Sequence, residues 1–157
     1  MILGACALDG RTGHEAGRML LAQLYTRQTG QPLPPIALTE RGKPYFPDCP
    51  WHFSITHTSR HAFCVLAKRP VGIDAEEADR QVNPRLADKI LSPGERTQYD
   101  AAEEKGRALL TFWVLKEAAV KCSGQGLQGY PNDTDFRLDD PRVFEAEGCI
   151  LAVVTEE

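Results

Sequence analysis

The chain has 157 residues, of which 42% are apolar and 25% are charged, and its net charge is −4. These values are typical of an ordinary globular protein, and its apolar runs are shorter than the roughly 18 residues that a membrane-spanning helix needs. Neither half carries the dense basic stripe of a nucleic-acid-binding protein. We therefore expect no membrane and no nucleic-acid partner. The N-terminus has no basic stretch before its apolar run, so it does not resemble a signal peptide and a cytoplasmic location is expected.

Cysteines and charges are unevenly informative. The five cysteines are widely spaced, which predicts neither a zinc site nor disulfides, and Cys64 and Cys149 lie in apolar runs that predict burial.

Residues 1–72 carry 8 Lys and Arg against 4 Asp and Glu, whereas residues 73–157 carry 10 against 18. An acidic half that holds a metal and a basic half that faces it would suit a bound polyphosphate. Ordinary variation in surface charge explains the same counts equally well.

The N-terminal segment begins with a strand and a helix. Residues 2–8 predict a strand, and the capping-box pattern from Thr12 to Glu15 opens a helix that Gly30 closes. Short apolar stretches predict the strands that follow, of which the last three are expected to be consecutive and antiparallel. These strands are expected at 36–39, 45–46, 53–56, 62–67 and 71–76.

The C-terminal segment is richer in helix. Asn83 and Pro84 resemble an N-cap followed by proline at the first helical position, and Ser92 with Glu95 forms a second capping box. A longer helix is expected over 104–122, stopped by the glycines after it. Strands are then expected at 135–138, 143–146 and 149–154.

This order of elements predicts the fold class. It indicates an α+β chain of two similar halves, each a helix packed on a small, mostly antiparallel sheet. The halves are expected at 1–72 and 73–157, with a site between them.

Charged side chains are concentrated in two of these elements. Asp74 and Glu76 alternate on a predicted strand and so point to the same face. Glu117 precedes Lys121 by one helical turn, with Lys116 beside it. If strand and helix pack together, three carboxylates converge, and hard cations such as Mg²⁺ bind at such oxygen sites together with substrate phosphates.

Each of these features also has an ordinary structural explanation. Glu117 and Lys121 could form a helix-surface ion pair, and the strand alternation could mark a half-exposed edge. A histidine such as His57 is more often structural than functional, and Trp113 is expected in the core. Only the joint occurrence of the features favours phosphate chemistry.

Four segments in a fixed order resemble the 4′-phosphopantetheinyl transferases. They cover about residues 41–127, and Thr56-His57-Thr58 precedes the Asp74 segment, as in the pseudo-dimeric branch that activates surfactin-type synthetases. The resemblance implies that fold, with one active site between the halves of a monomer. The segments are Gly42-Lys43-Pro44-Tyr45-Phe46, then 53–58, then Gly72-Ile73-Asp74-Ala75-Glu76, then 113–121 with Gly124 and Gly126.

The chain departs from the family pattern in three places. Thr56 and Thr58 stand where the family has serines, and Ala75 stands where it has isoleucine. Only 41 residues precede Gly42, whereas members of this branch have a longer N-terminal half. Basic contacts to the coenzyme from that missing region have no counterpart in the pattern.

The resemblance implies a reaction and roles for the charged residues. The reaction transfers the 4′-phosphopantetheine arm of coenzyme A to a serine of an acyl, polyketide or peptidyl carrier protein and releases adenosine 3′,5′-bisphosphate. Asp74, Glu76 and Glu117 would hold Mg²⁺, for which Mn²⁺ could substitute. Lys116 and Lys121 would stabilise the developing charge on the phosphates, and Glu117 would accept the serine proton.

The resemblance also implies contacts at the other end of the coenzyme. His57, flanked by the hydroxyls of Thr56 and Thr58, would bind the 3′-phosphate. The turn Gly42-Lys43-Pro44 would let the backbone approach the adenine, and Lys43 would reach a phosphate.

Two other functions remain open from the sequence. A generic Mg²⁺-dependent phosphohydrolase or nucleotidyl enzyme could use the same three carboxylates, although the Lys-Glu-x-x-x-Lys pattern has no evident use in hydrolysis. A catalytically weak module that binds a carrier protein or coenzyme A is the other. The intact acidic trio argues against it, because clustered carboxylates are costly without a metal.

Overall fold

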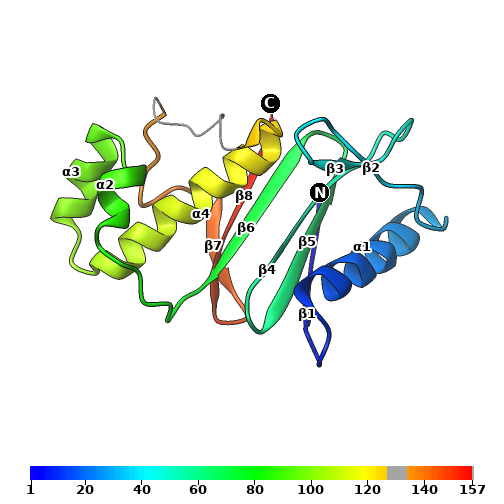
Figure 1. The fold of residues 1–157 in the computed structure, drawn as a ribbon, viewed down its shortest axis with the longest axis horizontal. Coiled ribbons are helices and arrows are strands. Elements are labelled where there is room, and N and C mark those ends of the chain that lie inside the picture. The colour runs from blue at the N-terminus through cyan, green and yellow to red at the C-terminus, as the bar shows by residue number, and fades with distance from the viewer. Residues whose placement is uncertain (127–133, 157) are drawn as a thin grey trace.

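Two three-stranded antiparallel sheets, each covered by one long helix, make up this computed structural model, which describes residues 1–126 and 134–156 (Figure 1). The N-terminal sheet has the order β1-β5-β4 and carries helix α1. The C-terminal sheet has the order β6-β8-β7 and carries helix α4. The predicted mixture of helices and antiparallel sheets is confirmed. The bounds of these elements are β1 Ile2–Ala7, α1 Gly13–Thr29, β4 His52–His57, β5 His61–Ala67, β6 Val71–Glu77, α4 Lys105–Ser123, β7 Val143–Ala146 and β8 Cys149–Thr155.

Helix α1 forms where its capping signals predict it. The Thr12 hydroxyl accepts from the Glu15 amide at 3.1 Å, and the Thr12 amide donates to Glu15 Oε2 at 2.8 Å. The helix ends at Gly30, whose φ of 70° is left-handed. Its buried residues pack on the outer face of β5, where Leu66 lies. A short hairpin of β2 (Ala37–Leu38) and β3 (Pro44–Tyr45) connects α1 to β4.

The sequence predicted that β6 would follow β4 and β5 in one antiparallel sheet, and this prediction is wrong. Strand β6 pairs with β8 instead, with Asp74 opposite Ala152. The turn at 68–70 therefore leads from one sheet to the other. β6 still lies beside β4, because the Ser54 hydroxyl accepts from the Ile73 amide at 3.1 Å. Its true partner comes from the end of the chain, and a local strand pattern cannot reveal such a partner.

An apolar layer separates the two sheets. Phe63 and Val65 of β5 face Ile73 of β6 and Leu151 of β8 across it. The opposite face of the C-terminal sheet packs on α4 through a second apolar cluster that includes Leu115. No helix in the described part of the chain is long and apolar enough to cross a membrane.

All five cysteines are described and none is in a disulfide; Cys64 and Cys149 are buried, as predicted.

Two short helices precede α4, namely α2 (Leu86–Ile90) and α3 (Pro93–Ala101). The capping box at Ser92 and Glu95 is confirmed. The start of α2 was predicted two residues too early, because the Asn83 side chain accepts from the Arg85 amide at 3.0 Å within a turn and the helix begins after it.

The strand expected at 135–138 does not form. Its amides bond to side chains of α3 instead: the Phe136 amide donates to Glu95 Oε1 at 3.0 Å, and the Leu138 amide donates to Gln98 Oε1 at 3.1 Å. These side chains take the place of a neighbouring strand as hydrogen-bond partners, which satisfies the buried backbone without a sheet.

Gly72 sets how closely β6 approaches α4. A Cβ atom at this position would lie 2.0 Å from the carbonyl oxygen of Ala118 and 2.4 Å from the amide nitrogen of Cys122. Both are backbone atoms that a rotamer change cannot move. We expect Gly72→Ala to lower the free energy of unfolding by at least about 2 kcal/mol in urea denaturation. Gly106→Ala, on the exposed side of α4 with open space around it, should stabilise by about 0.5–1 kcal/mol. Equal stability of both variants would contradict this packing constraint.

Glu77 connects the β4–β5 turn to β6. Its carboxylate accepts from Arg60 Nη2 at 2.5 Å and from the Ser59 hydroxyl at 3.1 Å, and the Arg60 bond lowers the pKa of Glu77 from 4.5 to about 2. A lowered pKa in the folded state stabilises the fold above the unfolded pKa and is lost as the pH falls through the folded pKa.

We therefore expect Glu77→Gln to destabilise the protein at pH 7. Because the depressed pKa is lost on acidification, this difference from the wild type should vanish as the pH falls from about 4.5 to about 2. Urea denaturation at a series of pH values measures it. Asp79→Asn removes a mostly exposed partner of the same guanidinium and should have a much smaller effect. A pH-independent Glu77→Gln difference would contradict the prediction.

Candidate active site

The packing of α4 on β6 brings Lys121 to Asp74. Lys121 Nζ donates to Asp74 Oδ1 at 2.7 Å, and the Thr56 hydroxyl donates to the same oxygen at 3.3 Å. Asp74 is only 7% exposed, so its two partners, Thr56 of β4 and Lys121 of α4, compensate for its lost hydration. The carboxylate therefore sits where β4, β6 and α4 meet.

Glu76 is held by two partners that the sequence did not assign to it. Trp113 Nε1 donates to Glu76 Oε1 at 3.1 Å, and Arg80 Nη1 pairs with the same oxygen at 2.5 Å. Trp113 lies one helical turn before Glu117, so the helix spacing places it on the same side of α4. Arg80 follows the strand in a turn, and no local pattern signals that contact.

The three predicted carboxylates affect one another electrostatically. Burial is the main cause that raises the pKa of Glu117, and the charges of Asp74 and Glu76 raise it further, while Lys121 lowers it. Burial also raises the pKa of Asp74, which Lys121 partly offsets. The sequence prediction that strand and helix bring these charges together is consistent with this coupling.

The donor set suits a hard divalent cation, because it consists of carboxylate oxygens. In the described part of the chain, however, no three acidic, His or Cys side chains stand ready as metal ligands. Asp74 and Glu76 hold Lys121 and Arg80 instead. A cation that binds here would compete with Lys121 for Asp74 and with Arg80 for Glu76.

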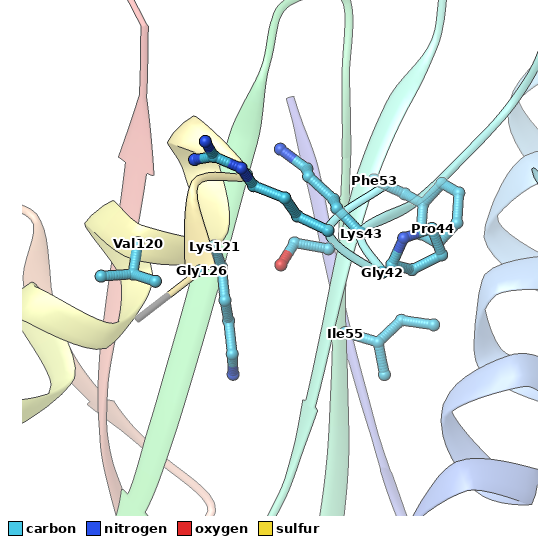
Figure 2. Close-up of a pocket in the computed structure, with 11 residues that line it drawn as sticks. Gly42, Lys43, Pro44, Phe53, Ile55, Val120, Lys121 and Gly126 are labelled. Atoms are coloured by element: carbon cyan, nitrogen blue, oxygen red, sulfur yellow. The ribbon is translucent and has the colours of Figure 1, made fainter. Parts of the chain in front are cut away.

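A pocket of about 270 Å³ is lined in part by Lys121, the partner of Asp74 (Figure 2). Figure 2 shows Lys121 entering from α4 and Phe53 and Ile55 from β4. The described lining contains three cations and no carboxylate, with an apolar wall around them. The cations are Arg41, Lys43 and Lys121, and the apolar side chains are Pro44, Phe53, Ile55 and Val120. Such a pocket suits a ligand that is both anionic and partly apolar.

The turn before β3 docks on the C-terminal end of α4. Lys43 Nζ donates to the Cys122 carbonyl at 2.5 Å, and Arg41 Nη1 donates to the Gln125 carbonyl at 3.1 Å. Burial lowers the pKa of Lys43. The left-handed φ of 67° at Gly124 favours glycine, and a Cβ there would lie 2.9 Å from Lys43 Cδ, so Lys43 would have to shift. The sequence expected Lys43 to reach a phosphate; its ammonium is directed to a helix carbonyl.

His57 is exposed at the end of β4 and lies against the first turn of α1. A Cβ on Gly13 would be 2.2 Å from His57 Cγ, so the ring covers this glycine. The Thr56 hydroxyl is directed to Asp74, and the Thr58 hydroxyl accepts amides of the following turn at 3.2–3.3 Å. The expected phosphate-binding trio is thus not gathered around His57, and Gly13 is a neighbour that the motif did not indicate.

Lys116 lies on another side of α4 from Glu117, since successive residues are rotated by about 100° along a helix. Its side chain is fully buried, and its ammonium pairs with fully buried Glu95 Oε2 at 2.9 Å. It does not line the pocket between the turn and α4. The resemblance implied that Lys116 contacts coenzyme phosphates. In the structure, its ammonium pairs with Glu95 and so joins α3 to α4.

We expect Lys116→Met to lower the free energy of unfolding by about 3–5 kcal/mol, because Glu95 would remain buried without its cation. The double variant Lys116→Met/Glu95→Gln should be more stable than Lys116→Met alone, as measured by urea denaturation. Arg137→Met, at an exposed ion pair with Asp139, should cost far less stability. Additive losses at 95 and 116 would rule out the coupling.

Comparisons with known proteins agree with the motifs. Residues 70–149 match the model of the 4′-phosphopantetheinyl transferase superfamily. A 4′-phosphopantetheinyl transferase of Bacillus subtilis is 32% identical over 104 residues, which cover 64% of this chain and 46% of that protein. Enterobactin synthase component D of Escherichia coli (strain K12) is 34% identical over 116 residues, covering 72% and 54%.

The chain spans about half the length of the curated relatives that it matches. The match to the family model nevertheless covers just over half of the chain and includes the strand and the helix that carry Asp74, Glu117 and Lys121. The order of motifs, the convergence of those side chains and the family match agree: this chain belongs to the 4′-phosphopantetheinyl transferase superfamily.

Proposed function

We propose that the chain transfers the 4′-phosphopantetheine arm of coenzyme A to a serine of a carrier protein and releases adenosine 3′,5′-bisphosphate. The observation that carries the proposal concerns Lys121, which lines the cationic pocket and also pairs with Asp74. Asp74 belongs, with Glu76 and Glu117, to what we call the acidic cluster. A nucleotide bound in the pocket would thereby have its phosphates beside the carboxylates. Family membership and the activity for which the Bacillus subtilis relative is named support the same activity.

The acidic cluster is the proposed metal site. Asp74, Glu76 and Glu117 would hold Mg²⁺ or Mn²⁺, which would neutralise charge on the pyrophosphate of coenzyme A when bound. Lys121 is placed to stabilise the negative charge that the leaving bisphosphate gains.

Glu117 is the proposed proton acceptor. As the bond between the serine oxygen and phosphorus forms, the bond from phosphorus to the bisphosphate oxygen breaks, and the serine proton moves to the Glu117 carboxylate. Burial and the neighbouring carboxylates raise the pKa of Glu117, and a raised pKa makes a carboxylate a better base near neutral pH.

The coenzyme would lie along one face of β4. Phe53, Ile55 and His57 alternate on the strand and so share the face that α1 partly covers, and Phe53 and Ile55 also line the pocket. A nucleotide with its base on this apolar wall would extend toward His57, which we assign to the 3′-phosphate. Residues 1–72 would then act as the coenzyme-binding half and residues 73–157 as the metal-binding half of a pseudo-dimeric monomer.

Peptidyl carrier proteins are the first acceptors to test. The order of His57 before Asp74 is that of the surfactin-synthetase-activating branch, and one relative is named as a component of enterobactin synthase. Acyl and polyketide carriers follow as alternatives. An excess of basic residues in 1–72 would suit an acidic surface on such a partner.

One observation favours the binding-module alternative. Lys121 and Arg80 pair with two of the three carboxylates, so the cluster is partly compensated without a metal.

Intact mass of apo carrier proteins, incubated with this protein, coenzyme A and Mg²⁺, tests the proposal. We expect a gain of one phosphopantetheine group that EDTA prevents. Asp74→Asn should slow this transfer by at least about 100-fold, because it weakens both the metal site and the placement of Lys121. Glu103→Gln, exposed before α4, is the matched control and should act like the wild type.

The other outcomes separate the alternatives. Coenzyme A binding without any gain of mass would favour the binding module. Phosphate release from coenzyme A without a carrier would favour a phosphohydrolase. Full activity of Asp74→Asn would refute the assignment of the metal site.

A further inference from the structure

Among the described residues, three cations line the pocket, and they differ in the groups with which they already form hydrogen bonds or ion pairs. Lys121 pairs with Asp74 at 2.7 Å, on the acidic side of the pocket. Lys43 bonds to the Cys122 carbonyl at 2.5 Å. Arg41 is exposed, and one of its guanidinium nitrogens donates to the Gln125 carbonyl at 3.1 Å.

Lys43 serves as a latch between the turn and the helix. Its ammonium lies at the C-terminal end of α4, where the carbonyl groups and the helix dipole favour a cation. Burial lowers the pKa of Lys43. The Cys122 carbonyl accepts a hydrogen bond from the Lys43 ammonium and so compensates for the lost hydration. Moving this ammonium to a ligand would leave that carbonyl without its donor and the turn without its anchor.

Arg41 is built differently for phosphate. A guanidinium has five N–H donors in a rigid planar fork that matches two phosphate oxygens at once, and it stays charged. The bond to the Gln125 carbonyl engages one nitrogen and holds the side chain at the pocket. The remaining donors of the fork can serve a ligand without breaking the latch of Lys43.

We infer that Arg41 is the pocket residue that binds a phosphate of coenzyme A, whereas Lys43 fixes the turn that presents it. This inference rests on the proposed function and assigns the basic contact for which the sequence motifs offered no counterpart. Arg41 directly precedes Gly42, whose left-handed φ of 82° reverses the chain. The Arg41 side chain reaches the segment just after α4, where it bonds to the Gln125 carbonyl.

Calorimetric titration of the whole chain with coenzyme A tests the inference. Arg41→Gln should weaken binding at least about tenfold, the loss typical of one charge-assisted phosphate contact. Arg41→Lys keeps the charge but loses the fork, so it should recover only part of the affinity. Arg27→Gln, an exposed arginine of α1 outside the pocket lining, changes the net charge equally and should bind like the wild type.

Titration with dephospho-coenzyme A distinguishes the phosphates. If Arg41→Gln weakens both ligands equally, Arg41 binds the pyrophosphate; if it weakens only coenzyme A, Arg41 binds the 3′-phosphate. Thermal unfolding separates the latch from the ligand contact: Lys43→Met should lower the melting temperature, and Arg41→Gln should leave it nearly unchanged.

Two results would overturn different claims. Wild-type affinity of Arg41→Gln for coenzyme A would refute the role of Arg41 and leave the proposed function intact. Failure of the wild type to bind coenzyme A would refute the proposed function itself.

Discussion

The close packing of helix α4 on strand β6 is the constraint on which the candidate site depends. Gly72 makes it possible, since any side chain there would meet the backbone of α4 at Ala118 and Cys122. Because the two elements touch along their backbones, Lys121 reaches Asp74 and Glu117 lies within electrostatic range of it. The same contact fixes the C-terminal end of α4, on which the turn at Lys43 docks. One glycine thus aligns the acidic cluster with the cationic pocket.

Buried charge performs two different tasks on the two sides of α4. Toward α3, Lys116 and Glu95 are both fully buried and neutralise each other, which is an arrangement that joins helices and leaves little capacity for a ligand. Toward β6, three carboxylates face fewer compensating cations, and burial together with the charges of neighbouring carboxylates raises the pKa values of Asp74 and Glu117. Buried carboxylates with raised pKa values are the kind of environment that functional sites use.

The turn at 41–43 joins the β2–β3 hairpin to the C-terminal end of α4, and this contact shapes the pocket. Its two cations bond carbonyl groups at the end of α4, so the pocket exists only while the turn and the helix stay together (Figure 2). The chain covers only about half of its curated relatives, yet both walls of this pocket come from its own elements. The wall from the end of α4 lies within the residues 70–149 that match the family model, and the opposite wall, from 41–44 and 53–55, precedes them.

Local chemistry determined what the sequence alone could predict. The capping boxes at Thr12 and Ser92 and the ends of α1 and α4 at glycine depend on hydrogen bonds within a few residues, and the alternation of Asp74 and Glu76 follows from strand geometry. Four motifs in order indicated the family. Contacts between distant segments decided the rest. Strand β6 pairs with β8 rather than with β5. The Phe136 amide bonds to Glu95 rather than to a neighbouring strand, and Lys116 pairs with Glu95 rather than lining the site. These choices compare alternative burial and hydrogen-bond partners that lie far apart along the chain, and only the assembled fold brings those partners within reach.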